Sequence, residues 1–74
     1  MTIKEACLKV MESCDTPQPQ TELVKQMVKL TGYSYESCRC NSFRNPNAIP
    51  ELWKKYKKVL INGKSHWVKG RIYQ

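Results

Sequence analysis

The chain has 74 residues, is 41% hydrophobic and carries 13 Lys and Arg against 6 Asp and Glu, for a formal net charge of +7. This length fits one small domain over residues 1–74, and the hydrophobic content argues against intrinsic disorder. No apolar run approaches the roughly 18 residues that a membrane helix needs, and the N-terminus has no basic patch followed by an apolar stretch, so we expect a cytoplasmic protein.

The first predicted element is an amphipathic helix from Thr2 to Cys14. Thr2 and Glu5 have the spacing of a capping box, in which each side chain satisfies the backbone N–H of the other residue. Pro17 and Pro19 cannot continue a helix and therefore mark its end. Apolar residues recur at the three-to-four spacing of one buried helix face: Ile3, Ala6, Cys7, Val10, Met11 and Cys14.

Two further helices are predicted downstream. The first runs from Gln20 to Leu30, and Gly32 follows where a left-handed residue closes a helix. Ser34 is a suitable N-cap for the second, from Tyr35 to Arg44. The expected buried residues of the first are Leu23, Val24, Met27, Val28 and Leu30. Those of the second are Tyr35, Cys38 and Ser42, with Phe43 beside them.

The C-terminal part predicts a β-hairpin. Lys57–Ile61 is rich in β-formers, Asn62-Gly63 is the strongest two-residue hairpin signal, and Lys64–Tyr73 returns as a second strand. Upstream, Pro50 either opens a helical turn or belongs to an extended stretch over residues 47–56. Large aromatic side chains of this part are expected to fill the core: Trp53, Tyr56 and Trp67.

The chain contains four cysteines, which raises the question of disulfides or zinc. Cys7 and Cys14 stand about 10 Å apart along one helix, so they cannot bond to each other. The cysteine spacing matches no common zinc signature, and the chain has one His. We expect small buried thiols, with no metal and no cofactor. A rival interpretation is a zinc-stabilised module that uses Cys38 and Cys40 with another cysteine or His66.

Positive charge is concentrated in the second part of the chain. Residues 1–31 hold four Lys and four acidic residues, whereas residues 32–74 hold nine basic residues against Glu36 and Glu51. We interpret the first part as scaffold and the second as a contact surface for a polyanion, for which nucleic acid is the usual partner. A single His, few carboxylates and no glycine-rich phosphate loop argue against an enzyme.

The order of helix, helix, glycine turn, capped helix and β-hairpin resembles a winged helix-turn-helix domain. The residues that carry the resemblance are Leu23 to Leu30, Thr31-Gly32-Tyr33-Ser34, Tyr35 to Arg44, and Val59 to Val68 around Asn62-Gly63. It implies an α+β fold of three helices with a C-terminal hairpin wing, and a third helix that enters the major groove of DNA. The chain departs from the family pattern in the Cys and Ser residues of that helix and in the long segment over residues 45–52.

The resemblance also implies which residues contact nucleic acid. Arg39 would read guanine through its planar fork, and Asn41 would read adenine if the helix turned it outward. The contacts implied for the third helix are Ser37, Arg39, Cys40, Asn41 and Arg44, the last of these to phosphate. Those implied for the hairpin are Lys64, Ser65 and His66, with charge around them from Lys54, Lys55, Lys57 and Lys58. We expect the third helix and the hairpin to lie side by side, with their cationic groups aimed the same way.

This interpretation predicts a small transcriptional regulator, or a DNA-architecture or recombination accessory protein, whose partner is double-stranded DNA. The alternative is a winged-helix module that binds protein, as an inhibitor or an assembly factor, since the fold serves both purposes. DNA binding requires one continuous basic surface, whereas protein binding requires an exposed apolar patch. The sequence leaves both monomer and homodimer open.

Overall fold

Four helices and a three-stranded antiparallel sheet make up the part of the chain that the structure, a computed structural model, describes: residues 1–12 and 14–70. The predicted α+β class is confirmed, but the described part has one helix more than expected because Pro50 does open a helix. The elements in order are α1 (Ile3–Met11), β1 (Gln18–Pro19), α2 (Gln20–Thr31), α3 (Tyr35–Cys40), α4 (Pro50–Lys55), β2 (Tyr56–Ile61) and β3 (Lys64–Lys69).

The ends of α1 and α2 follow local chemistry. The capping box at the start of α1 is present, with the Glu5 N–H donating to Thr2 Oγ1 at 3.1 Å and the Thr2 N–H donating to Glu5 Oε1 at 2.9 Å. Gly32 closes α2 in the left-handed region, with φ of 80°. Both caps were predicted and are confirmed, although α1 ends at Met11, earlier than expected.

Helix α3 is shorter than the predicted span to Arg44. The Ser34 hydroxyl caps its start by accepting from the Ser37 N–H at 3.2 Å. The Asn41 side chain donates to the Ser37 carbonyl at 2.8 Å, which satisfies a carbonyl of the last turn and ends the helix at Cys40. The chain then turns, and this turn brings residues 42 and 43 into the core.

Two residues predicted to be buried are exposed instead. Leu30, in the last turn of α2, is 39% exposed. Tyr35, in the first turn of α3, is also exposed. The remaining predicted buried residues of α2 and α3 are buried or half-buried: Leu23, Val24, Met27, Val28, Cys38, Ser42 and Phe43.

The sheet has the strand order β1-β3-β2. The predicted Asn62-Gly63 turn is confirmed, because both residues have positive φ (54° and 76°), as a type I′ turn requires. Strand β1 was not predicted; it pairs Gln18 with Trp67 and Pro19 with His66. The second strand of the hairpin ends at Lys69, and the predicted extension to Tyr73 lies outside the described residues.

Trp67 is the centre of the hydrophobic core. It is fully buried, and its ring centroid lies 5.1 Å from those of both Phe43 and Trp53. Its indole Nε1 donates to Gln20 Oε1 at 2.9 Å. The predicted core placement of the aromatics is confirmed, with Tyr56 buried and Trp53 half-buried. One side chain therefore joins β3 to α2, α4 and the turn after α3.

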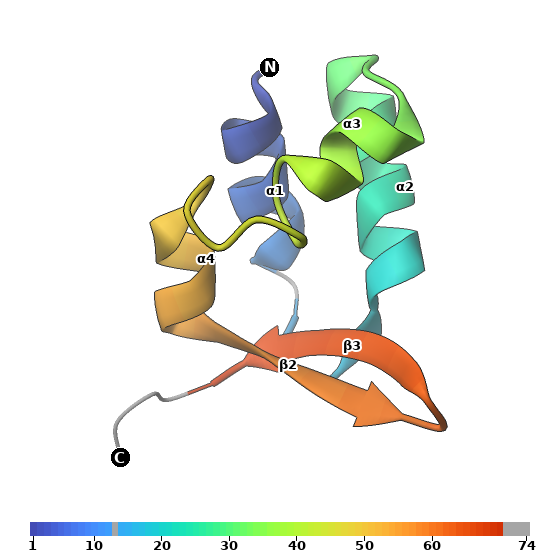
Figure 1. Cartoon of the computed structure of the whole chain (residues 1–74), viewed down its shortest axis with the longest axis vertical. Coiled ribbons are helices and arrows are strands. Elements are labelled where there is room, and N and C mark those ends of the chain that lie inside the picture. The colour runs from blue at the N-terminus through green and yellow to red at the C-terminus, as the bar shows by residue number, and fades with distance from the viewer. Residues whose placement is uncertain (13, 71–74) are drawn as a thin grey trace.

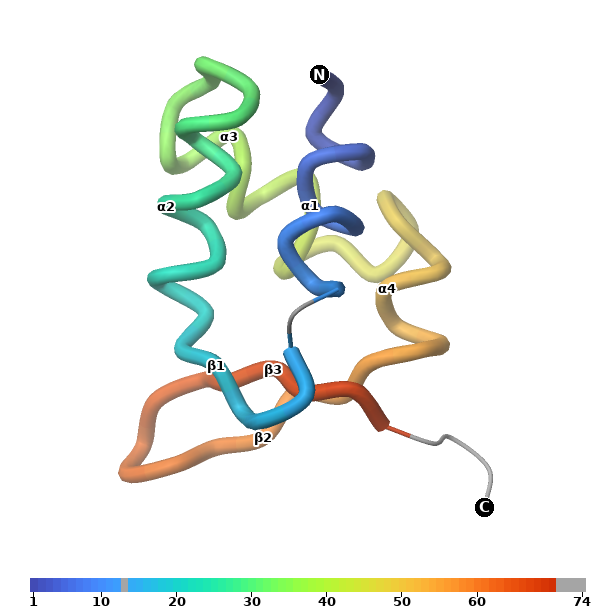
Figure 2. Tube along the Cα trace, turned by 180° about the vertical axis from the view of Figure 1, so that it is seen from behind, coloured from blue at the N-terminus to red at the C-terminus, as the bar shows by residue number. Residues whose placement is uncertain are grey.

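The helices α1, α2 and α4 extend away from the sheet, and α3 lies in the half of the molecule away from it (Figures 1 and 2). Helix α2 runs the length between them, from the sheet at its N-terminus to α3 at its C-terminus. No helix within the described ranges is long and apolar enough to cross a membrane.

We expect replacement by Phe to lower the unfolding free energy more at Trp67 than at Trp53. Trp67→Phe removes a hydrogen bond and ring volume from a fully buried site, so we expect it to lower the unfolding free energy by about 1–3 kcal/mol. Trp53→Phe removes an N–H that is buried without a partner among the described residues, so we expect a cost of less than about 1 kcal/mol. Urea unfolding followed by circular dichroism measures both; equal costs would contradict the central position of Trp67.

Candidate nucleic-acid interface

The basic residues divide into those that pair with a carboxylate and those that do not. Four described ion pairs are formed: Lys4–Glu51 at 3.0 Å, Lys25–Glu22 at 3.6 Å, Arg39–Glu36 at 2.7 Å and Lys69–Asp15 at 3.2 Å. The other described Lys and Arg side chains form no ion pair with a described carboxylate, although Lys54 and Arg44 are close enough to Glu51 and Glu36 to interact electrostatically with those carboxylates: Lys9, Lys29, Arg44, Lys54, Lys55, Lys57, Lys58 and Lys64. Most of this uncompensated charge therefore lies after α3.

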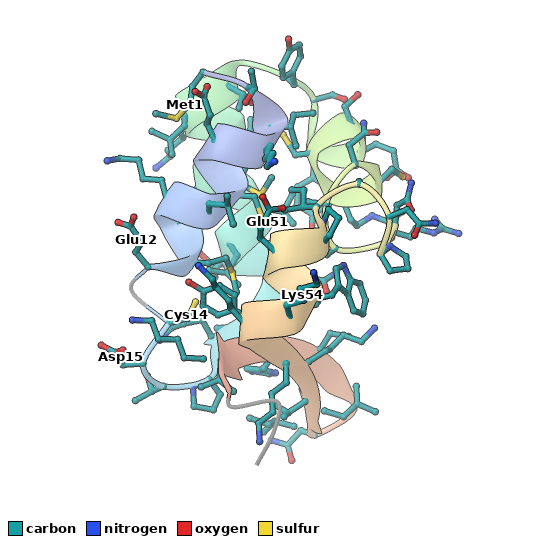
Figure 3. The ribbon with its side chains drawn as sticks, turned by 90° about the vertical axis from the view of Figure 1, so that its left-hand side faces the viewer. Met1, Glu12, Cys14, Asp15, Glu51 and Lys54 are labelled. Carbon is teal, nitrogen blue, oxygen red and sulfur yellow. The ribbon has the colours of Figure 1, made fainter. Side chains whose placement is uncertain are left out.

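We call the group Lys54, Lys55, Lys57, Lys58 and Lys64 the lysine surface; all five are exposed. Lys54 and Lys55 occupy the last turn of α4, where the helix dipole favours cations (Lys54 is labelled in Figure 3). Lys57 and Lys58 are the second and third residues of β2, and Lys64 lies about 10 Å further along the hairpin, opposite Ile61.

Gly70 supports Lys57 by having no side chain. A Cβ built on Gly70 would lie 3.0 Å from both Cγ and Cδ of Lys57, closer than ordinary packing allows. The aliphatic part of Lys57 therefore lies across the glycine backbone, which keeps its stem ordered while its ammonium group faces solvent.

Helix α3 is electrically neutral on its own. The Arg39 guanidinium donates to Glu36 Oε2 at 2.7 Å, and the Cys40 thiol donates to the same oxygen at 3.3 Å. The hydrogen bond from Arg39, and next the one from Cys40, holds the pKa of the Glu36 carboxyl below its usual value. The two charges of α3 thus cancel, and Arg39, 29% exposed, can offer a guanine edge a two-bond contact through Nη2 only after that nitrogen leaves Glu36.

The other implied contact residues of this region differ in what they offer. The Asn41 amide is already used in ending α3, so it does not point freely outward as adenine readout requires. Ser37 is half-buried and its side chain makes no hydrogen bond with another described residue. Arg44 is exposed and forms no ion pair with a described carboxylate, which suits the phosphate contact expected of it.

The expected side-by-side placement of third helix and hairpin is wrong. Helix α3 lies in the half of the molecule away from the hairpin along the longest axis, and the whole molecule measures 35 Å along that axis (Figures 1 and 2). The reason is that α2 separates them: its N-terminus abuts β1 and its C-terminus leads into α3. Within the hairpin, the implied residues Lys64, Ser65 and His66 do lie together.

An open groove of about 760 Å³ separates the hairpin from the first turn of α2. Thr21 lines one wall, and Lys64, Ser65 and His66 line the other. His66 Nδ1 lies 2.9 Å from the Lys64 carbonyl, and because a carbonyl can only accept, Nδ1 carries the proton. The lining of the groove thus includes Lys64, Ser65 and His66 of the hairpin and also Glu22 of α2.

The cysteines form no metal site in the described part. Cys7, Cys14 and Cys38 are buried free thiols and Cys40 is half-buried. No three His, Cys, Asp or Glu side chains within residues 1–12 and 14–70 are grouped so that they could hold a metal ion. The rival zinc interpretation therefore has no ligand set there.

Sequence reasoning underestimated two features. Lys54 and Lys55 were expected only to add charge around the contact residues, yet they continue the same run of uncompensated lysines. The Glu36–Arg39 pair was missed, although its i, i+3 spacing is a recognisable signal on a helix.

Comparisons of the chain with protein-family models, with curated proteins and with solved structures find no match in any of the three. Two surfaces of the described residues stand out: the lysine surface and the outer edge of strand β2.

Because Cys7 is buried, we expect the folded protein to lose stability at alkaline pH. Burial, and next the neighbouring Cys14, raises the pKa of the Cys7 thiol from 9.0 to about 12. An unfolded thiol ionises at lower pH than the folded one, so this contribution to stability is present below pH 9 and is lost as pH rises toward 12. We expect the stability difference between wild type and Cys7→Ala to narrow over that range. Urea unfolding at several pH values measures it, with Val24→Ala as a buried control whose difference stays constant.

Proposed function

We propose that this protein binds duplex DNA as a winged helix-turn-helix protein and serves as a small transcriptional regulator or a DNA-architecture or recombination accessory factor. The observation that carries the proposal is the lysine surface, whose five cations form no ion pair with a described carboxylate. Lysines that follow one another along α4 and the hairpin repel one another, and a polyanion reduces that repulsion. Phosphates spaced along a duplex supply such a partner.

The order of elements supports the winged-helix assignment. Helix α2 ends at Gly32, a short turn leads to the Ser34-capped α3, and the Asn62-Gly63 hairpin follows. Helix α4 is an addition to this order, and it carries two lysines of the lysine surface at its C-terminal end. In this chain the basic character that the family pattern assigns to the third helix is transferred to α4 and the hairpin.

Because α3 and the hairpin are separated, they do not form the single continuous basic surface that the sequence leads us to expect, and the proposal depends on the lysine surface rather than on α3. At 3.4 Å per nucleotide along a strand, the 35 Å long axis corresponds to about ten nucleotides. In this proposal the lysine surface and the hairpin lie on the phosphate backbone, and α3 enters the major groove further along. The phosphate contacts supply affinity, and any sequence preference depends on Arg39 exchanging Glu36 for a guanine edge.

Salt dependence tests the phosphate contacts. With about four to six phosphates neutralised, the affinity for random duplex DNA falls with salt on a log–log slope near −4 to −5. Replacing Lys57 and Lys58 together by Gln reduces this slope by about 2, because each phosphate contact contributes about 0.9. The control Lys9→Gln removes an exposed, uncompensated charge from α1 and leaves the slope unchanged. Fluorescence anisotropy provides the measurement; an equal effect of both changes would remove the lysine surface from the interface.

Arg39 and Lys64 separate base readout from backbone contact. On a site selected from random duplexes, Arg39→Ala is expected to cost about 1–3 kcal/mol of binding free energy, whereas Lys64→Ala weakens all sequences alike. Glu36→Gln strengthens binding, because it frees Arg39 and removes an anion from α3. Competition anisotropy against selected and scrambled duplexes distinguishes the three, and an Arg39→Ala variant with unchanged affinity and preference would show that α3 is not the recognition helix.

A further inference from the structure

Strand β2 leaves one side of its backbone open. It is an outer strand, because the sheet order is β1-β3-β2. The two-residue turn makes Ile61 and Lys64 the closing hydrogen-bonded pair, and the bonded positions then alternate along the ladder. The backbone N–H and C=O groups of Lys58 and Leu60 therefore point away from β3, toward solvent.

The opposite edge of the sheet is closed to any further strand. Strand β1 has two residues, and one of them, Pro19, has no backbone N–H to donate. Helix α2 begins at the next residue, Gln20, so β1 cannot be extended. An additional strand can join this sheet only beside β2.

The side chains of β2 divide into a cationic half and an apolar half. Lys57 and Lys58 are exposed at its start. Leu60 is 70% exposed and Ile61 is 39% exposed at its end, with half-buried Val59 between the two halves. An exposed leucine beside unpaired backbone groups is a feature that soluble proteins usually avoid.

We propose that β2 is a docking edge for an extended segment of another protein, in which acidic residues face Lys57 and Lys58 and apolar residues face Val59, Leu60 and Ile61. The main-chain bonds of an added strand supply affinity, and the alternating side chains supply specificity. Charge complementarity selects this partner over a second copy, because two chains of net charge +7 repel each other and edge lysines oppose self-pairing. The docking edge shares Lys57 and Lys58 with the lysine surface, but the backbone hydrogen bonds of an added strand distinguish it from DNA contacts made through lysine side chains.

The direction in which a partner strand pairs with β2 determines the sequence of the peptide used as a probe. An antiparallel partner meets the apolar half of β2 first, so the probe is a blocked nine-residue peptide with valine and isoleucine in its N-terminal half and glutamate in its C-terminal half. The reversed peptide probes parallel pairing. A peptide of glutamates alone, with the same charge, measures electrostatic attraction without strand addition.

Amide hydrogen exchange of the full, ¹⁵N-labelled chain tests the proposal. We expect the mixed peptide, in one of its two directions, to slow exchange at the Lys58 and Leu60 amides about tenfold or more. The Val59 amide, already directed at β3, changes little. Neither the glutamate peptide nor duplex DNA slows these two amides, so DNA binding can fail or succeed without affecting the result.

Three variants measure the two halves of the edge. Leu60→Ala weakens the mixed peptide about fivefold, and Lys57→Glu with Lys58→Glu weakens it about tenfold or more. Lys9→Glu, an exposed lysine on α1, leaves peptide affinity within about twofold. All the substituted side chains are exposed, so folding is retained. Lys58 and Leu60 amides that stay unprotected when the mixed peptide is added would overturn the proposal. Protection that grows with protein concentration in the absence of peptide would also overturn it, and would show that the edge pairs with a second copy of this chain.

Discussion

The fold depends on the packing of one indole. Trp67 lies in the middle of β3, between β1 and β2, and its ring contacts those of Phe43 and Trp53. Its single polar group is satisfied by Gln20, the first residue of α2. In a domain this small, few residues can reach every layer, so the loss of one such side chain loosens the sheet, α2 and α4 together. The lysine surface inherits its geometry from this packing, because α4 and β2 are both anchored to Trp67.

The basic side chains of the described residues differ in whether they form an ion pair with a carboxylate. Some basic side chains are matched to carboxylates, as in the Glu36–Arg39 and Lys4–Glu51 pairs, whereas Lys9 on α1 and Arg44 after α3 are not; Glu51 lies on the side of α4 that faces α1 (Figure 3). Around β2 the lysines are left uncompensated and stand beside an exposed leucine. Exposed ion pairs contribute little to stability. The main consequence of these pairs is therefore that they determine which basic side chains are left without a carboxylate.

Features set by neighbouring residues could be predicted, and features set by distant ones could not. The Thr2–Glu5 box, Gly32 and the Asn62-Gly63 turn depend on a few adjacent side chains and were foreseen. Strand β1 escaped prediction because two residues have no periodicity, and only their pairing with β3 makes them a strand. The end of α3 depended on the particular bond that the Asn41 side chain makes.

The same distinction holds for the candidate site. The clustering of lysines after residue 31 is visible in the composition, so the lysine surface could be anticipated in outline. The separation of α3 from the hairpin could not, since it follows from the path of α2 across the whole molecule. The exposure of Leu60 likewise depends on how far the hairpin extends beyond the helices, which hydrophobicity alone does not reveal.

The left-handed pair Asn62-Gly63 has a consequence for how this chain can diverge. Side chains on a strand alternate between faces, so a slip of one position would carry Trp67 into solvent and turn His66 inward. The turn fixes the pairing register of β2 with β3, and this register decides which side chains of the hairpin are buried and which are exposed. Descendants of this sequence can therefore lengthen the ribbon by matched pairs of residues, or vary its tip, while an unmatched single insertion within either strand is tolerated only as a bulge.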